Sequence, residues 1–110
     1  MKYYLIDEIS GRDMERLYLY LKDNRTMSGL DKLFWIEVPE EFLNDVQAGH
    51  GTCRPYFFSL ETGAGVIKTE LFIRTLKGLK CTCSSYADER QTRFITGFVD
   101  GIIRNLDIRT

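Results

Sequence analysis

Residues 53–75 read CRPYFFSLETGAGVIKTELFIRT, two alternating runs of apolar and polar residues on either side of a glycine-containing segment. Alternation with a period of two is typical of β-strands that bury one face. We therefore predict an antiparallel hairpin of residues 53–61 and 66–75 that turns at residues 62–65. One face of this hairpin is apolar and forms a layer of the core: Tyr56, Phe58, Leu60, Ile67, Leu71 and Ile73.

The opposite face of the predicted hairpin is mixed, with aromatic and charged side chains and with Cys53 opposite Arg74. If this face is open to solvent, Phe57, Val66 and Phe72 form an apolar patch of the kind that marks a partner surface. If a helix covers the face, the same residues belong to the core. The sequence leaves both alternatives open.

A further strand at residues 80–83 is expected to complete a three-stranded meander. In this register Cys81 and Cys83 lie on the same mixed face as Cys53. Cys53 and Cys81 are then two strand spacings, about 10 Å, apart at their backbones. That separation is too large for a disulfide and wide for one shared metal ion.

Before the hairpin, the sequence alternates between strand and helix patterns. Residues 3–6 read as a short strand, and residues 33–38 read as an internal strand because they are apolar on both faces. A helix is expected after Ser10, which stands three residues before Asp13 as an N-cap. Its buried stripe recurs at helical spacing: Met14, Leu17, Tyr18 and Leu21.

Two shorter features separate these elements from the hairpin. Ser28 and Gly29 are expected to form a turn. A short helix through Phe42, Leu43 and Val46 is expected after Pro39, with Glu40 and Glu41 at its N-terminal end. The paired glutamates are therefore interpreted as helix caps rather than as catalytic groups.

The longest helix is predicted at residues 86–106, with a capping signature at Ser85 and Asp88. Its apolar face is wide: Phe94, Ile95, Phe98, Val99, Ile102, Ile103 and Leu106. A stripe of this width predicts deep burial against the sheet.

Gly97 and Gly101 lie four residues apart on the border of that apolar face. A glycine inside a helix is unfavourable by about 1 kcal/mol relative to alanine, so a compensating contact is expected at each position. The contact is either close backbone packing within the chain or a helix contact between two copies in a homodimer.

Together these patterns predict the order β-α-β-α-β-β-β-α in a single α+β domain over residues 1–110. We expect a two-layer domain with a mixed or antiparallel sheet of about five short strands and a long C-terminal helix packed on one face. The chain of 110 residues is long enough to bury one hydrophobic core. The order of the first two strands does not follow from the sequence.

The charge balance argues against several classes of partner. Charged residues make up 28% of the chain and the net charge is −1, which favours a folded domain without general attraction to nucleic acid or anionic membranes. Residues 1–49 carry six Lys or Arg and ten Asp or Glu, a net −4, whereas residues 50–110 carry nine and six, a net +3. Because no binding motif accompanies the basic half, we interpret its charges as solvated surface.

The sequence also bears on localisation. The apolar run at residues 3–6 is too short for a signal peptide, and acidic residues follow it at once. Three cysteines, an odd number, fit a reducing compartment better than a disulfide framework. We therefore expect a cytoplasmic protein without a membrane partner.

The one histidine and the three cysteines fall into two short clusters, His50-x-x-Cys53 and Cys81-x-Cys83. Tetrahedral zinc is held by four nitrogen or sulfur donors, often delivered as two local pairs, so these residues form a candidate zinc site. Their spacing matches no standard zinc motif, and reduced, partly buried thiols also explain the cysteines. We therefore expect no cofactor and hold zinc as the alternative; a redox thiol activated by Arg74 is a third interpretation.

These observations favour a non-catalytic binding or assembly domain that forms a homodimer or meets another protein. The expected interface uses Phe57 and Phe72 on the mixed sheet face, or Gly97 and Gly101 on the helix. The alternative is a metal or redox-thiol protein using the histidine and cysteine clusters. Acid–base catalysis is not expected, because no orienting carboxylate for the lone histidine is visible in the sequence.

Overall fold

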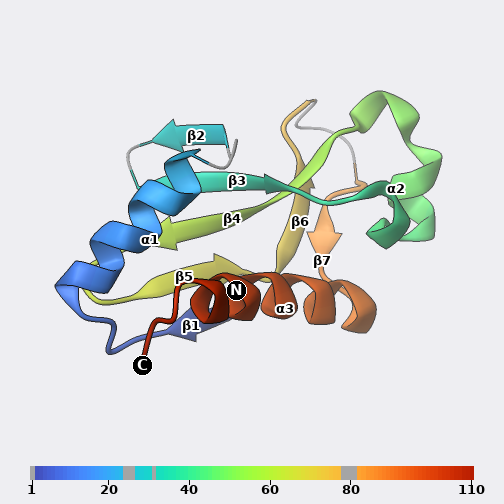
Figure 1. The fold of residues 1–110 in the computed structure, drawn as a ribbon. Coiled ribbons are helices and arrows are strands. Elements are labelled where there is room, and N and C mark those ends of the chain that lie inside the picture. Colours follow the sequence, from blue (N-terminus) through green and yellow to red (C-terminus); the bar gives the residue numbers. More distant parts are fainter. Residues whose placement is uncertain (1, 24–26, 31, 78–81) are drawn as a thin grey trace.

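The computed structural model describes residues 2–23, 27–30, 32–77 and 82–110, and it confirms an α+β fold (Figure 1). The η elements are short 3₁₀ helices. In chain order the elements are β1 (Tyr3–Ile6), α1 (Gly11–Asp23), β2 (Met27–Leu30), β3 (Leu33–Glu37), η1 (Glu40–Phe42), α2 (Asp45–Gly49), η2 (Gly51–Cys53), β4 (Tyr56–Thr62), β5 (Ile67–Glu70), β6 (Phe72–Thr75), β7 (Ser85–Tyr86) and α3 (Glu89–Asn105).

The described strands pair antiparallel in the order β1-β5-β4-β3-β2, and β6 pairs with both β4 and β7. The sheet has seven strands rather than about five, for two reasons. Ser28 and Gly29, predicted to form a turn, lie in β2, where Ser28 pairs with Phe34 of β3 and the register shifts between Ser28 and Leu30. Leu71 interrupts the predicted second hairpin strand, whose halves are β5 and β6, and its N–H donates to the carbonyl of Lys2 instead.

The hairpin itself is confirmed, but its register differs from the prediction by even numbers of residues. Glu61 lies opposite Lys68 rather than Val66, and Phe57 lies opposite Arg74. Because successive strand residues point to opposite faces, an even shift leaves each side chain on its predicted face. The predicted core face is therefore correct for β4, β5 and β6 although the pairing is not.

Both long helices pack on that face of the sheet. The Tyr18 ring of α1 meets Phe34 of β3 edge-on at 5.8 Å, and the rings of Phe94 and Phe98 in α3 meet Phe58 of β4 edge-on at 6.2 and 5.8 Å. The side chains they bury form one hydrophobic cluster that includes Leu17, Leu21, Phe34, Ile36, Phe58, Leu60, Ile67, Ile73, Ile95, Val99 and Ile102. The two-layer prediction is thus confirmed, and the sheet face away from the helices carries the mixed set of side chains.

The helix boundaries follow their caps. The Ser10 hydroxyl accepts from the N–H of Asp13 at 3.1 Å, as predicted for the start of α1. The predicted start of the last helix at residue 86 is wrong, because Ser85 and Tyr86 pair with β6 as β7 and a capping box formed by Asp88 and Gln91 sets the first turn of α3 at Glu89.

The single short helix predicted after Pro39 is divided in two. Glu40–Phe42 forms the 3₁₀ turn η1, and α2 begins after the N-cap Asn44. The side chain of Asn44 accepts from the N–H of Gln47 at 2.8 Å, and the Gln47 side chain accepts from the N–H of Asn44 at 3.2 Å. This second capping box defines where α2 starts.

Candidate functional site

The helix α2 lies at one end of the sheet (Figure 1). His50, which ends α2, comes together with Cys53 of η2 and with Cys83, which precedes β7. One imidazole nitrogen of His50 and the Sγ atoms of the two cysteines all lie within 4.8 Å of one another. Around a tetrahedral zinc ion, with Zn–S near 2.3 Å and Zn–N near 2.0–2.1 Å, adjacent ligand atoms stand about 3.5–3.8 Å apart. A closure of about 1 Å therefore brings the three donors to bonding distance of one ion.

Local chain geometry holds two of these donors together. His50 ends α2 and precedes η2, and its carbonyl accepts from the N–H of Cys53 at 2.9 Å. Residues three apart in a 3₁₀ turn lie above one another, so both side chains leave the same side of the turn. The prediction that Cys53 belongs to the hairpin strand is wrong, because β4 begins only at Tyr56.

Cys83 arrives from the connection between β6 and β7 and is 1% exposed. The predicted register placed Cys83 opposite Phe72, but Tyr86 occupies that position. The strand predicted at residues 80–83 is therefore wrong in its described part, because Thr82 and Cys83 lie in a turn and β7 begins only at Ser85. Cys83 belongs to the hydrophobic core cluster rather than to the mixed face. Cys81, the fourth predicted ligand, lies outside the described residues.

Two buried glutamines fix the backbone of Cys83. Gln47 Nε2 donates to the Cys83 carbonyl at 3.2 Å, and Gln91 Nε2 donates to Gln47 Oε1 at 2.9 Å and to the Phe42 carbonyl at 2.9 Å. Each glutamine also closes the capping box of its own helix. Hydrogen bonds thus link the N-terminus of α2 to the N-terminus of α3 and to the connection between β6 and β7 that carries Cys83.

Thr75 fixes Cys53 in a comparable way. Its hydroxyl donates to the Cys53 carbonyl at 2.5 Å and accepts from the N–H of Lys77 at 3.0 Å. The N–H of Thr75 donates to Ser84 Oγ at 3.1 Å, next to Cys83. β6 therefore holds both cysteine segments in place.

Sequence reasoning missed Gln47, Gln91 and Thr75. Patterns for the glutamines were present, because Asn44 and Asp88 each stand three residues before a glutamine as in a capping box. The contact between the two boxes had no such signal, since it joins side chains far apart in the sequence.

The two interface residues predicted on the sheet, Phe57 and Phe72, are both more buried than expected. Phe57 is 6% exposed, so the prediction that it is an exposed aromatic is wrong; it lies between Glu37 of β3 and Arg74 of β6. Phe72 is half-buried, with the Tyr86 ring edge-on at 5.2 Å and the Arg74 guanidinium at 4.9 Å from its ring.

Gly97 and Gly101 do not pack closely on any other element that the structure describes. A Cβ added at either position would find no atom within 4 Å among the described residues beyond the helix's own backbone and adjacent residues. The first explanation for these glycines, close backbone packing on a neighbouring element, is therefore wrong. Nothing in the structure explains why glycine stands at these two positions.

One resolved pKa shift lies away from this site. Tyr4 of β1 donates its hydroxyl to Asp100 Oδ1 of α3 at 2.5 Å. This hydrogen bond, followed by burial and by the negative charge of Asp100, raises the pKa of Tyr4 above its ordinary value. The pair joins the edge strand to the C-terminal helix.

Comparisons of this chain with known protein families, with curated proteins and with solved structures find no match. No helix within the described ranges is long and apolar enough to cross a membrane.

Proposed function

We propose that this protein binds a zinc ion through His50, Cys53 and Cys83, and that the ion ties the segment before β4 to the connection between β6 and β7. One observation carries the proposal: three potential ligand atoms from two segments distant in the sequence lie within 4.8 Å of one another. In this proposal the ion is structural, and the domain needs no catalytic chemistry.

The donor set selects the class of metal. One imidazole and two thiols, with no carboxylate among the three, suit borderline and soft ions such as zinc and disfavour magnesium and calcium, which take oxygen ligands. Cys83 is buried and both other ligands are half-buried. A closed structural site agrees with this burial, because catalytic zinc sites keep one position open to substrate.

The hydrogen bonds around the cysteines support the same proposal. Thr75 and Gln47 hold the carbonyls of Cys53 and Cys83, so the backbone segments that present the sulfur atoms are fixed by buried polar side chains. A backbone fixed in this way limits the positions that the two sulfur atoms can take, which favours a preformed metal site.

Metal analysis of untagged protein, purified without chelator, tests the proposal directly. We expect near-stoichiometric zinc and, after exchange with Co²⁺, the visible absorption of a tetrahedral thiolate complex. Cys83→Ala should abolish both signals. Val99→Ala is the matched control, because it truncates another buried core side chain without touching a donor. Zinc-free wild-type protein that does not take up Co²⁺ would refute the proposal.

A second candidate function uses the sulfur atoms of Cys53 and Cys83, which lie within 4.8 Å of each other. In a redox role, the thiols of Cys53 and Cys83 would lose two electrons and two protons to hydrogen peroxide, giving a disulfide and two molecules of water. Thiol titration separates the two functions. Zinc coordination protects the thiols until a chelator is added, whereas a redox pair is oxidised whether or not zinc is present.

A further inference from the structure

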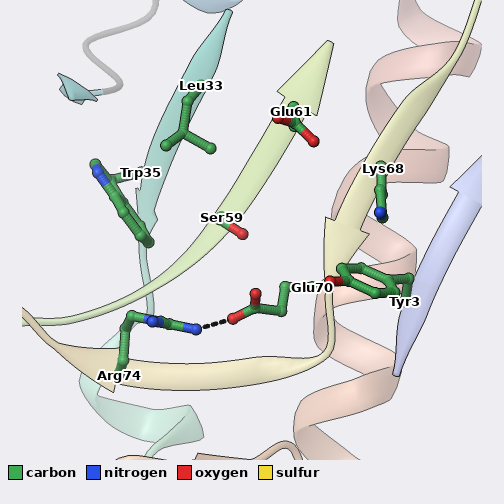
Figure 2. Close-up of a pocket in the computed structure, with 8 residues that line it drawn as sticks. All are labelled: Tyr3, Leu33, Trp35, Ser59, Glu61, Lys68, Glu70 and Arg74. Carbon is green, nitrogen blue, oxygen red and sulfur yellow. Dashed lines mark hydrogen bonds and ion pairs between the residues drawn. The ribbon is translucent and has the colours of Figure 1, made fainter. Parts of the chain in front are cut away.

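The sheet face away from α1 and α3 carries a shallow depression of about 200 Å³ (Figure 2). It is lined by Tyr3, Leu33, Trp35, Ser59, Glu61, Lys68, Glu70 and Arg74, contributed by five strands. Figure 2 looks onto this face with α3 behind the strands, and the lining side chains point toward the viewer's side of the sheet. Tyr3, which lines the depression, is 45% exposed, and Leu5 of the same strand is 53% exposed.

The side chains on this face follow an ordered pattern about the line between β4 and β5. Leu33 of β3 pairs with Glu61 of β4, Glu61 pairs with Lys68 of β5, and Lys68 pairs with Leu5 of β1. Read across the sheet, this row is aliphatic, acidic, basic and aliphatic. Each half of the row therefore has one aliphatic residue on the outside and one charged residue on the inside, and the two inner charges have opposite signs.

The next row of the same face repeats this relation two residues further along each strand. Trp35 of β3 pairs with Ser59 of β4, and Glu70 of β5 pairs with Tyr3 of β1. This row reads aromatic, hydroxyl, carboxylate and aromatic. In both rows, an apolar or aromatic residue of β3 and one of β1 flank polar residues of β4 and β5.

We propose that this face is the interface of a homodimer whose twofold axis runs along the strands between β4 and β5. A half-turn about that axis places the β3 and β4 half of one copy against the β5 and β1 half of the second copy. Glu61 then faces Lys68 of the partner subunit, Trp35 faces Tyr3 of the partner subunit, and Leu33 faces Leu5 of the partner subunit. The Ser59 hydroxyl can donate to Glu70 of the partner subunit, and the axis repeats every contact twice.

Charge favours a second copy over other occupants of the face. Its two cations and three anions, Lys68, Arg74, Glu37, Glu61 and Glu70, leave it nearly neutral, and Arg74 is already ion-paired with Glu70. A nearly neutral face gives little attraction for nucleic acid or an anionic membrane. Two such faces complement each other in charge and can pack as aligned sheets, in the manner of a β-sandwich.

The proposed interface is not the one expected from the sequence. It is centred on Trp35, Ser59, Glu61 and Lys68, and neither Phe57 nor Phe72 lines the depression. Gly97 and Gly101 lie on α3, in the helix layer on the other side of the sheet. The inference is independent of the zinc proposal, because none of the zinc ligands lies on this face.

A charge-swap experiment tests the twofold arrangement. Glu61→Lys alone sets positive against positive at both charge contacts, and Lys68→Glu alone sets negative against negative. An equimolar mixture of the two variants restores opposite signs at every contact. For the wild type, we expect light scattering to show twice the chain mass of 12.8 kDa at high concentration. Each variant alone should dissociate at least about 10-fold more readily, and the mixture should regain the wild-type mass.

Matched controls are Glu15→Lys and Arg12→Glu, which change the same charges on exposed positions of α1. These variants should leave the dimer unchanged. Measurements with and without chelator separate this interface from any bridging by metal. A wild-type mass of one chain at every concentration, or a mixture no more dimeric than its components, would overturn the proposal.

Discussion

Two buried regions of this protein are stabilised in different ways. Between the sheet and the helices α1 and α3, the buried side chains are almost all apolar and are held by packing. Around Cys83 the buried groups include Gln47 and Gln91, at 0% and 1% exposure, which are held by directed hydrogen bonds. An apolar layer loses stability in proportion to the volume removed, whereas a buried polar network depends on the presence of every partner.

The largest expected effect is in the apolar layer. Phe58 is fully buried and meets two rings of α3, so Phe58→Ala should lower the free energy of unfolding by about 3–5 kcal/mol. Phe98 is only half-buried, and Phe98→Ala should cost roughly half as much. Urea titration measures both values. Equal losses of unfolding free energy for the two variants would show that the loss does not depend on how deeply the ring is buried.

The sequence predicts the apolar layer well for a physical reason. The period of two in residues 56–62 and the helical period in residues 89–105 each indicate which side of the element is buried. For a strand, this assignment stays correct when the predicted pairing is shifted by an even number of residues. The faces of Tyr56 and Ile73 were therefore correct although the predicted strand pairing was not.

The polar region could be predicted only in part. The ligand types and their two clusters were visible in the sequence, and so was the short spacing from His50 to Cys53. Their meeting with Cys83 depends on the turn at Thr82 and Cys83, which stands in place of the predicted strand, and on hydrogen bonds between residues far apart in the sequence. Sequence periodicity over a strand of two residues such as β7 does not fix its position or its register.

Removal of metal should produce the next largest effect, confined to the polar region. If free zinc stands at about 100 to 1,000 times its dissociation constant, binding adds about 2.7–4.1 kcal/mol to the stability of the folded chain. A strong chelator should remove this contribution from wild-type protein and leave the stability of Cys83→Ala unchanged. Lowering the pH should have a similar effect, because the ligands must be deprotonated to bind the ion.

The Cys81→Ser variant tests whether Cys81, the fourth ligand predicted from the sequence, contributes to zinc binding. A zinc site closed by four protein ligands should lose affinity when Cys81 is replaced, yet retain the ion through His50, Cys53 and Cys83. Competition with a chromophoric chelator measures the change in affinity. An unchanged affinity would mean that the three described ligands account for all of the protein's contribution to binding.

A smaller effect is expected when one member of the glutamine network is removed. Gln91→Leu leaves Gln47 Oε1 and the Phe42 carbonyl without this donor, which should cost about 1–3 kcal/mol. The double variant Gln47→Leu with Gln91→Leu should cost less than the sum of the single variants, because the Gln47 acceptor is removed together with its donor. Strictly additive losses in chemical denaturation would contradict a coupled network.

The smallest effect concerns the contact between Tyr4 and Asp100, which joins the sheet edge to α3 outside both buried regions. The pKa of Tyr4 is raised in the folded state, so the folded chain holds the phenolic proton more tightly than the unfolded chain does. The stability from this pair is therefore fully present below the unfolded pKa of about 10, and it is lost as the pH rises through the folded pKa. Because both groups are partly solvated, we expect well under 1 kcal/mol.

The measurement is the unfolding free energy from about pH 9 to 11 for wild type and for Tyr4→Phe. Wild-type stability should fall more steeply over this interval, since phenylalanine has no proton to lose. Tyr86→Phe, at an exposed tyrosine of β7, is the matched control and should follow the wild-type slope. Identical slopes for wild type and Tyr4→Phe would mean that the contact contributes no measurable stability. The attachment of β1 to α3 would then rest on the packing of Tyr4 and Ile6 against the apolar layer alone.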